Sequence, residues 1–201
     1  MLLQETVLKA KSNDNYTEEM CFENEIVTEL DISEMEFESV EFINCRFDAC
    51  DFSRTSFYQV TFENCDLSNC IFAYSYWKSS RIQDCKADGS NLNQSTFKEM
   101  TIEKSSFHYV NCVNTLWEHC AVNDCSFRES FMSKVKFKNI RLANVNLTRV
   151  DFFKTPLKGI DLSECTIDDI MLSDTYSELR GAKINTVQAI DIAQLLGVRI
   201  V

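Results

Sequence analysis

A large apolar residue recurs at every fifth position of this chain over about 150 residues. Counted from Phe22 in steps of five, the series runs in register to Leu172, and 13 of the 15 phenylalanines belong to it. An amphipathic helix repeats near 3.6 residues and a half-buried strand near 2.0, so neither explains this period. A sustained fixed period indicates a repeat architecture in which every unit contributes to one continuous core.

A second column of smaller residues stands two positions before each large one, and it holds eight of the ten cysteines. Side chains two apart on an extended segment point to the same side, so we expect both columns to face inward and a bend to close each pentad. Five of these cysteines share one position modulo 20: Cys45, Cys65, Cys85, Cys125 and Cys165. Four pentads per coil then predict about eight coils and, at a strand spacing of ~4.8 Å, a rod roughly 37 Å long.

The aromatic members of the large column are expected to stack from one coil to the next. We interpret this ladder as core packing, which implies no cofactor. The cysteines are read as reduced, small core fillers, because the chain begins with too short an apolar run for a signal peptide. The predicted core ladder consists of Phe42, Phe47, Phe52, Phe57, Phe62, Phe72, Trp77, Phe97 and Trp117.

Several pentads resemble the consensus A(D/N)Lxx of the pentapeptide-repeat family, notably CDFSR (50–54), CDLSN (65–69) and SNLNQ (90–94). The resemblance covers about three quarters of the chain and implies an all-β, right-handed quadrilateral β-helix. We therefore expect an N-terminal cap segment over residues 1–19, the β-helix over 20–174, and a C-terminal capping and dimerization helix and strand over 175–201. Caps are needed because both ends of a β-helix leave hydrogen-bonding edges open.

The tail GAKINTVQAIDIAQLLGVRIV departs from the five-residue period and predicts a helix followed by a short strand at 198–201. Asn185 and Gln188 form a predicted capping pair, and Gly197 a helix stop. Together with CKADGSNLNQSTFKEM (85–100), the tail is similar to the Qnr and MfpA group of the family, which interacts with DNA gyrase. That resemblance implies a homodimer formed through Val187, Ile190, Ala193, Leu196, Val198 and Ile200; the alternative is a monomeric cap.

Acidic residues concentrate near the start of the repeat. The net charge of the chain is −11, and residues 22–70 hold twelve acids against two arginines, which gives −10. These 2.5 coils span roughly 12 Å, whereas duplex DNA carries one charge per ~1.7 Å, so the segment locally exceeds DNA in charge density. The predicted partner-binding acidic surface comprises Glu23, Glu34, Glu36, Glu38, Glu41, Asp48, Asp51, Glu63 and Asp66; simple solubility and edge protection are the alternative.

Residues 128–158 differ, with eight basic side chains against Glu129 and Asp151, so a uniform DNA mimic is not expected. Overall acidity argues against direct binding of nucleic acid. No glycine-rich phosphate loop, HExxH or CxxC occurs, and His108 and His119 are expected to be solvated, so we assign no catalytic, cofactor-binding or metal residues. No apolar stretch approaches the ~18 residues of a membrane span, and a cytoplasmic location is expected.

These observations lead to one functional hypothesis and one alternative. We expect a non-enzymatic DNA mimic that binds DNA gyrase or topoisomerase IV and modulates sensitivity to fluoroquinolones. The register has no insertion between 22 and 172, so the chain resembles the loopless rods of the group, and protection and inhibition of gyrase both stay open. The alternative is an interaction scaffold for another protein, because a repeat specifies architecture and not function.

Overall fold

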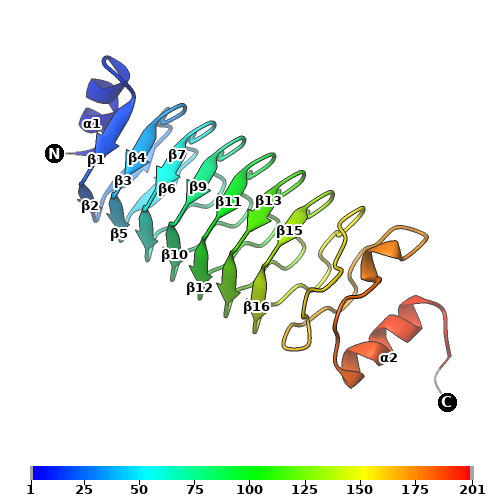
Figure 1. The fold of residues 1–201 in the computed structure, drawn as a ribbon. Coiled ribbons are helices and arrows are strands. Elements are labelled where there is room, and N and C mark those ends of the chain that lie inside the picture. The colour runs from blue at the N-terminus through cyan, green and yellow to red at the C-terminus, as the bar shows by residue number, and fades with distance from the viewer. Residues whose placement is uncertain (1, 200–201) are drawn as a thin grey trace.

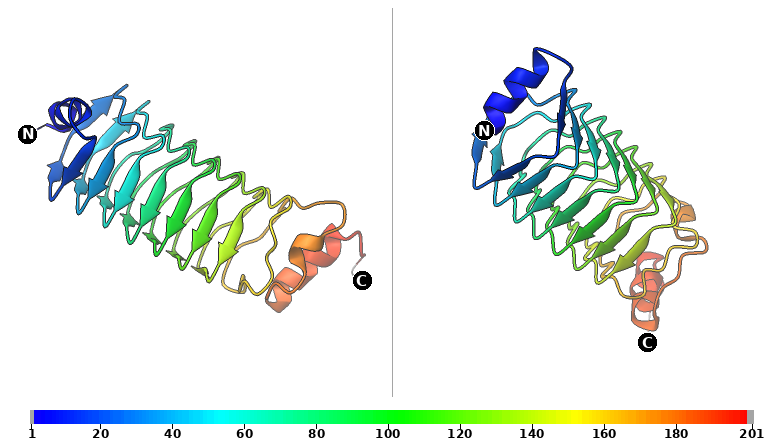
Figure 2. Two further views of the ribbon diagram at one scale, coloured as in Figure 1. Left: turned by 45° about the horizontal axis from the view of Figure 1, so that its top comes forward. Right: turned by 60° about the vertical axis from the view of Figure 1, so that its left-hand side comes forward.

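The computed structural model describes residues 2–199, which form a straight rod with a helix at each end (Figure 1). Helix α1 (Leu3–Lys11) precedes the β-helix, and a short 3₁₀ helix, η1 (Ser177–Leu179), and helix α2 (Thr186–Leu195) follow it. Two further views show the four-sided cross-section of the coils and the two helices at opposite ends (Figure 2). The predicted quadrilateral β-helix with a C-terminal helix is confirmed.

Four faces run along the rod. The first face is a seven-stranded parallel sheet: β1 (Tyr16–Glu18), β4 (Glu36–Glu38), β7 (Ser56–Tyr58), β9 (Tyr76–Lys78), β11 (Thr96–Lys98), β13 (Leu116–Glu118) and β15 (Lys136–Lys138). The second face is another: β2 (Cys21–Glu23), β5 (Glu41–Ile43), β8 (Thr61–Glu63), β10 (Arg81–Gln83), β12 (Thr101–Glu103), β14 (Ala121–Asn123) and β16 (Arg141–Ala143). The third face begins with β3 (Ile26–Thr28) and β6 (Arg46–Asp48) and continues, like the whole fourth face, as single bridges.

Strand pairing follows a constant offset of 20 residues, which confirms the coil of four pentads. Phe37 lies beside Phe57 on the first face, and Phe42 beside Phe62 on the second. Each long sheet has seven strands, slightly fewer than the eight coils expected. Beyond them, bridges keep the offset as far as Asp151 and Met171, and the last bridge, Asp161 to Lys183, is offset by 22. Two extra residues therefore loosen the final turn of the rod.

The corners need a left-handed backbone at the second residue after each large apolar one. Asn44 and Asn64 have φ values of 54° and 51°, and many non-glycine residues adopt the same conformation, which costs roughly 1–2 kcal/mol per residue. Hydrogen bonds between coils offset this cost: the Asn44 backbone N–H donates to the Glu63 carbonyl at 2.9 Å. The Asn64 amide also donates to the Asn44 side chain at 2.7 Å, so asparagines form a ladder along one corner.

A second type of corner depends on Asp or Asn directly before the large apolar residue. Asp51 accepts a hydrogen bond from the backbone N–H of Ser53 at 2.8 Å, and Asp66 accepts one from Ser68 at 3.0 Å. Such side-chain acceptors compete with strand pairing and favour a turn. Both corners lie on faces held by single bridges. The acidic position of the family consensus therefore has a structural role in shaping the coil.

The nine residues of the predicted aromatic ladder all lie in the interior, at most 2% exposed. Stacked rings include Phe42 on Phe62, with centroids 4.6 Å apart, and Phe57 on Trp77, at 3.8 Å. The buried Trp77 indole N–H donates to the Ser75 hydroxyl at 2.7 Å. Toward the C-terminus aliphatic residues replace many of the rings, although Phe127, Phe137 and Phe152 remain. An apolar void of about 20 Å³ remains there, lined among others by Val122, Leu142, Val145, Leu147 and Leu157.

The cysteines carry free thiols, and all except Cys21 are buried. In the stacked group the Cys65 thiol donates to the Phe42 carbonyl at 3.3 Å and accepts from the Cys45 backbone N–H at 3.4 Å. The thiol therefore takes the place of a small polar side chain. Ser80, in the same small-residue column, makes the equivalent contact by donating its hydroxyl to the Phe57 carbonyl. The thiol thus fills space in the core and also forms hydrogen bonds with backbone groups.

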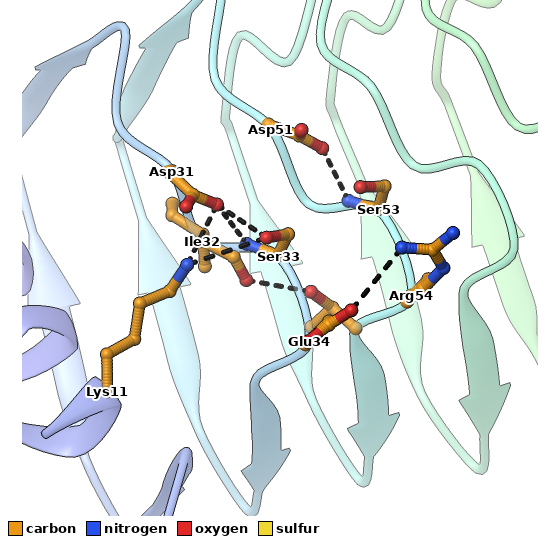
Figure 3. Close-up of polar contacts among 9 residues, drawn as sticks. Lys11, Asp31, Ile32, Ser33, Glu34, Asp51, Ser53 and Arg54 are labelled. Atoms are coloured by element: carbon orange, nitrogen blue, oxygen red, sulfur yellow. Dashed lines mark hydrogen bonds and ion pairs between the residues drawn. The ribbon is translucent and has the colours of Figure 1, made fainter.

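Helix α1 closes the first coil. It buries Leu3, Val7 and Ala10 against the core, and the Glu25 carboxylate accepts from the Leu3 backbone N–H at 2.9 Å, where the helix dipole favours an anion. At the other end of the helix, Lys11 forms an ion pair with Asp31 at 2.8 Å (Figure 3). The first strand, β1, already lies within the segment 1–19 that the sequence assigned to the cap.

Helix α2 closes the last coil, and its predicted Asn185–Gln188 capping pair is confirmed as a reciprocal capping box. Gln188 is 5% exposed and donates from its amide to the carbonyls of Leu162, at 2.7 Å, and Cys165, at 2.6 Å. The strand expected at 198–201 is absent from its described part: residues 198 and 199 follow a turn without pairing to a neighbour, and Ile200 and Val201 lie outside the described residues. Because the Gln188 amide already donates hydrogen bonds to carbonyls of the last coil, those carbonyls do not need a further strand as a partner.

Candidate protein-interaction surfaces

The densest acidic surface lies on the first and second faces near the N-terminal end. Glu36 and Glu38 project from β4, and Glu41 follows directly on β5. Glu23 and Glu63 project from the neighbouring strands β2 and β8 of the second face. All five side chains are exposed, and among the described residues none of them forms an ion pair. The alternation of strand residues thus presents these carboxylates outward while phenylalanines fill the core.

The other four predicted acidic residues lie elsewhere on the rod. Glu34 is paired with Arg54 at 3.3 Å on the fourth face, and Asp51 on that face accepts from Ser53 (Figure 3). Asp48 and Asp66 belong to the third face, where Asp66 serves as a turn acceptor. The nine residues therefore do not form one surface. Five gather on adjacent sheets, and the remainder are spread over the two opposite faces.

Tyr16 and Glu18 extend the acidic surface and were missed because the sequence placed them in the cap segment. The Tyr16 hydroxyl lies 2.7 Å from a Glu38 oxygen and 3.0 Å from a Glu18 oxygen. The hydrogen bond to Glu38 is the main cause that raises the pKa of Tyr16 above its ordinary value. Tyr16 therefore stays a neutral donor between two carboxylates. In the register of β1 and β4, Tyr16 lies beside Glu36 and Glu18 lies beside Glu38. The acidic surface therefore begins one coil earlier than the sequence predicted.

The C-terminal helix exposes a largely apolar surface to solvent. Val187 is 69% exposed, Ile190 45%, Leu196 51% and Val198 54%. Ala193 is partly buried, and Ile200 lies outside the described residues. The opposite side of the helix packs on the rod through Gln188 and Ile192. One side of α2 therefore packs on the last coil, whereas the other side is not covered by any other part of the described chain.

Exposed apolar side chains also gather on and beside the fourth face, away from the acidic surface. Sequence reasoning missed this group, although a signal exists: large apolar residues occupy outward positions that are polar in neighbouring coils. Because the pairing offset is 20, Phe131 stands in the same column as Ile71 and Met171. The exposed group comprises Ile71, Tyr74, Tyr109, Phe131, Phe153 and Met171.

The two histidines lie in different surroundings. His119 is exposed at a corner with φ of 57°, as expected for a solvated residue. The expectation was wrong for His108, which is partly buried: its Nε2 lies 2.8 Å from the Ser126 hydroxyl, and its backbone N–H donates to Asp88 at 2.8 Å. The contact with Asp88 spans 20 residues and the contact with Ser126 spans 18, so His108 bridges polar positions of the coils on either side.

Across residues 2–199, no three His, Cys, Asp or Glu side chains come together as metal ligands. None of the helices described is long and apolar enough to cross a membrane.

Comparison with known proteins identifies the repeat. The model of the pentapeptide repeat region matches residues 19–92 and 55–132, which together span more than half of the chain. No curated protein sequence matches significantly.

Solved structures with a similar fold include full-length QnrB1, a plasmid-mediated fluoroquinolone resistance protein, at 19% identity and a TM-score of 0.43, with coverage of 91% of this chain and 100% of that one. HetL, a pentapeptide repeat protein involved in heterocyst differentiation regulation in Nostoc, is 12% identical with a TM-score of 0.30, and 90% of this chain and 96% of that one are covered. A pentapeptide repeat protein of the Arabidopsis thaliana thylakoid lumen is 13% identical with a TM-score of 0.20, at 70% and 71% coverage.

Proposed function

We propose that this chain, which belongs to the pentapeptide-repeat family, is a non-enzymatic cytoplasmic rod that binds DNA gyrase or topoisomerase IV by partial DNA mimicry. The observation that carries the proposal is the acidic surface of the first two coils. There Glu36, Glu38 and Glu41 stand side by side on adjacent faces, and no cation of the described chain neutralises them. A topoisomerase presents a basic surface to DNA, and complementary charge would steer the rod to that surface.

The geometry of the coil supports mimicry of a limited stretch of DNA. Residues in one column repeat every coil, at ~4.8 Å, so Glu18 and Glu38 place charges at a spacing comparable with the 3.4 Å rise of phosphates along one DNA strand. The mimicry ends at the third coil of the first face, where Tyr58 and then Lys78 occupy the same column. The rod would therefore engage the enzyme through its N-terminal third. Occupying the DNA site would change the sensitivity of the enzyme to fluoroquinolones.

The test is a supercoiling assay with purified gyrase and with topoisomerase IV, each with and without a fluoroquinolone. The wild-type rod should alter activity or drug sensitivity at micromolar concentration. The triple variant Glu36→Gln, Glu38→Gln, Glu41→Gln should lose the effect. Glu164→Gln, Asp168→Asn, Asp174→Asn is the matched control, because it removes the same charge from exposed positions at the opposite end. No effect of the wild-type rod on either enzyme would refute the proposal.

A homodimer formed through the C-terminal helix belongs to the same proposal. Its support is the exposed apolar side of α2, on which Ile190 and Leu196 are 45% and 51% exposed. Burying these side chains against a second copy would remove apolar surface from water. The variant Ile190→Asp, Leu196→Asp should be monomeric by light scattering, whereas the control Gln194→Asp should stay dimeric. A monomeric wild-type protein would contradict this part.

An interaction scaffold is the second candidate, and the exposed apolar group of the fourth face favours it. Phe131, Phe153 and Met171 lie 48%, 40% and 48% exposed on or beside this face. Such side chains are common where a protein partner binds. In a pull-down from bacterial lysate, this candidate predicts capture that is lost in Phe131→Ser, Met171→Ser and that contains no topoisomerase subunit.

A further inference from the structure

The first face carries opposite charges at its two ends. In each three-residue strand of this face, the middle residue is the inward one, and the residue after it points outward. Along the paired strands these outward residues are Glu18, Glu38, Tyr58, Lys78, Lys98, Glu118 and Lys138, and Lys158 follows one coil later. The column before the central residue contains Glu36 near one end and Lys136 near the other. Strands β1 to β15 run in order along the rod, so the face is acidic at the N-terminal end and basic at the other (Figure 1).

These charges are open to solvent. Glu18, Glu36, Lys136 and Lys158 are exposed, and no ion pair within the described residues includes any of them. Lys138 makes only a long contact of 3.7 Å with Glu118. A wide separation keeps the two ends from neutralising each other: β4 and β15 are five strand spacings apart, or roughly 24 Å. Charges at that distance are largely screened at physiological salt.

We propose that the first face is an interface with a second copy of this chain, placed antiparallel to the first. A two-fold axis parallel to the strands reverses the order of the coils and keeps each column opposite itself. When this axis lies midway between β9 and β11, three opposite-charge pairs coincide: Glu36 with Lys136, Glu38 with Lys138, and Glu18 with Lys158. Symmetry doubles these to six, so a single placement matches every charge at both ends.

The centre of this interface is less favourable and limits its strength. Lys78 meets Lys98 there, although Lys98 lies 3.7 Å from Glu118 and 5.9 Å from the ring centroid of Tyr76 in its own chain. Seven strand spacings and a strand width of three residues cover roughly 34 by 10 Å, or about 340 Å² per copy. This is well below the ~800 Å² per partner of a stable complex. The association is therefore weak, reversible and strongly dependent on salt.

A polyanion such as duplex DNA is the competing occupant of the basic end. The observations favour a second copy, because the acidic end would repel DNA whereas it contributes half of the pairs in the antiparallel arrangement. The net charge of −11 acts against DNA in the same way. Self-association would also cover Glu36 and Glu38, so it should compete with any partner that binds the acidic surface.

Sedimentation velocity at about 100 μM protein tests the interface, in the Ile190→Asp, Leu196→Asp background so that the C-terminal helix does not contribute. The parent should associate at 20 mM salt and be monomeric at 500 mM. Glu36→Lys, Glu38→Lys and Lys136→Glu, Lys138→Glu should each weaken self-association at least tenfold. An equimolar mixture of these two variants should form a heterodimer, because every altered charge then meets an opposite one. The matched control Lys104→Glu, Asp124→Lys, at the corner between the second and third faces and so outside the proposed interface, should behave like the parent.

Zero-length carbodiimide crosslinking provides a second measurement on the parent protein. It joins a carboxylate to an amine in contact, so Glu38–Lys138 or Glu36–Lys136 products must come from two copies, given the ~24 Å between them in one chain. A monomeric parent at 20 mM salt, a mixture that fails to associate, or absence of these crosslinks would overturn the proposal. Retardation of a 20-bp duplex by a monomeric parent, lost in Lys136→Glu, Lys138→Glu, would instead assign the basic end to nucleic acid.

Discussion

The two halves of the rod share one backbone geometry but differ in their interior and in their charge. In the first half, phenylalanines stack from coil to coil and the outside is acidic; on the second face, Phe42 and Phe62 lie 4.6 Å apart in near-parallel planes. In the second half, the corresponding positions of the second face are Val122 and Leu142, a void remains, and the outside of residues 128–158 has eight basic groups against two acids. Backbone hydrogen bonds at an offset of 20 continue from the first half into the second, until the last bridge of the rod shifts to an offset of 22.

The β-helix therefore tolerates a wide range of core and surface side chains as long as the five-residue period is kept. Backbone bonds between coils define the shape, and the core residues determine how tightly each coil is held. The outward positions are then free to carry binding surfaces. We expect the first half to be the more stable part of the rod, because stacked aromatic rings bury more apolar surface than the aliphatic side chains that replace them.

The largest expected effect comes from removing a stacked ring. Phe62→Ala, in the middle of β8, should lower the free energy of unfolding by about 3–5 kcal/mol. Leu142→Ala, at the equivalent position of β16, should cost only about 2 kcal/mol, because Leu142 is already partly exposed beside the void. Urea unfolding of both variants measures the difference. Equal losses would show that the two halves are packed alike.

The two ends should differ in the strength of their caps. Gln188→Ala leaves the carbonyls of Leu162 and Cys165 without its amide and should lower the stability of the last coil by about 1–3 kcal/mol. Glu25→Ala at the first coil should cost about 1 kcal/mol or less, because water can replace a carboxylate at the exposed start of α1. Amide hydrogen exchange resolves each end separately. Gln194→Ala, exposed on the same helix as Gln188, serves as the control and should change nothing.

Alkaline pH should act on the buried thiols. Burial raises the pKa of Cys125 to about 11, from an ordinary value of 9.0. The unfolded thiol therefore ionises first: the stabilising contribution is complete below pH 9 and is lost as the pH rises from about 9 to about 11, by about 3 kcal/mol at most. Cys125→Ser should flatten this part of the pH profile, since serine in the same column, such as Ser105, keeps a hydrogen bond to a backbone carbonyl. An unchanged profile would assign the alkaline loss to other groups.

The smallest effect should come from filling the void. Val122→Ile adds one methylene beside it and should stabilise the protein by about 0.5–1 kcal/mol. The same substitution at Val60, which is fully buried, should destabilise by about 1 kcal/mol or more through overpacking. Thermal unfolding of the two variants gives the sign of each. A stabilising Val60→Ile would mean that the first half also contains unfilled space.

Much of the fold follows from sequence because one period encodes it. The column that contains Phe42 and Phe62 and the column that contains Cys45 and Cys65 give the inward positions, and their recurrence modulo 20 gives the coil. The first coil was harder to assign, because Thr17 stands where later coils carry an aromatic residue and Glu25 stands where later coils carry an inward cysteine such as Cys45. Glu25 makes sense only with the α1 N-terminus above it, a tertiary contact that no local pattern encodes.

The binding surfaces were predicted less completely. The density of acidic residues along the sequence located the charge near the N-terminal end. It did not distinguish Glu36, which projects into solvent, from Asp51, which accepts a hydrogen bond within a turn, because both are acidic side chains. Distribution over four faces separates residues that are close in sequence, so Glu34 and Glu36 lie on different faces. The opposite polarity of the first face also required the strand register, since Glu38 and Lys138 are 100 positions apart in the chain.

Displacement of DNA from gyrase is the measurement that tests DNA mimicry by the acidic surface. Fluorescence anisotropy of a labelled duplex bound to gyrase should fall as wild-type rod is added, with half-displacement in the micromolar range at 100 mM salt. The variant Glu36→Gln, Glu38→Gln, Glu41→Gln should require at least tenfold more protein, whereas Glu164→Gln, Asp168→Asn, Asp174→Asn should match the wild type. Undiminished anisotropy with wild-type rod, or equal displacement by both variants, would contradict DNA mimicry by the acidic surface.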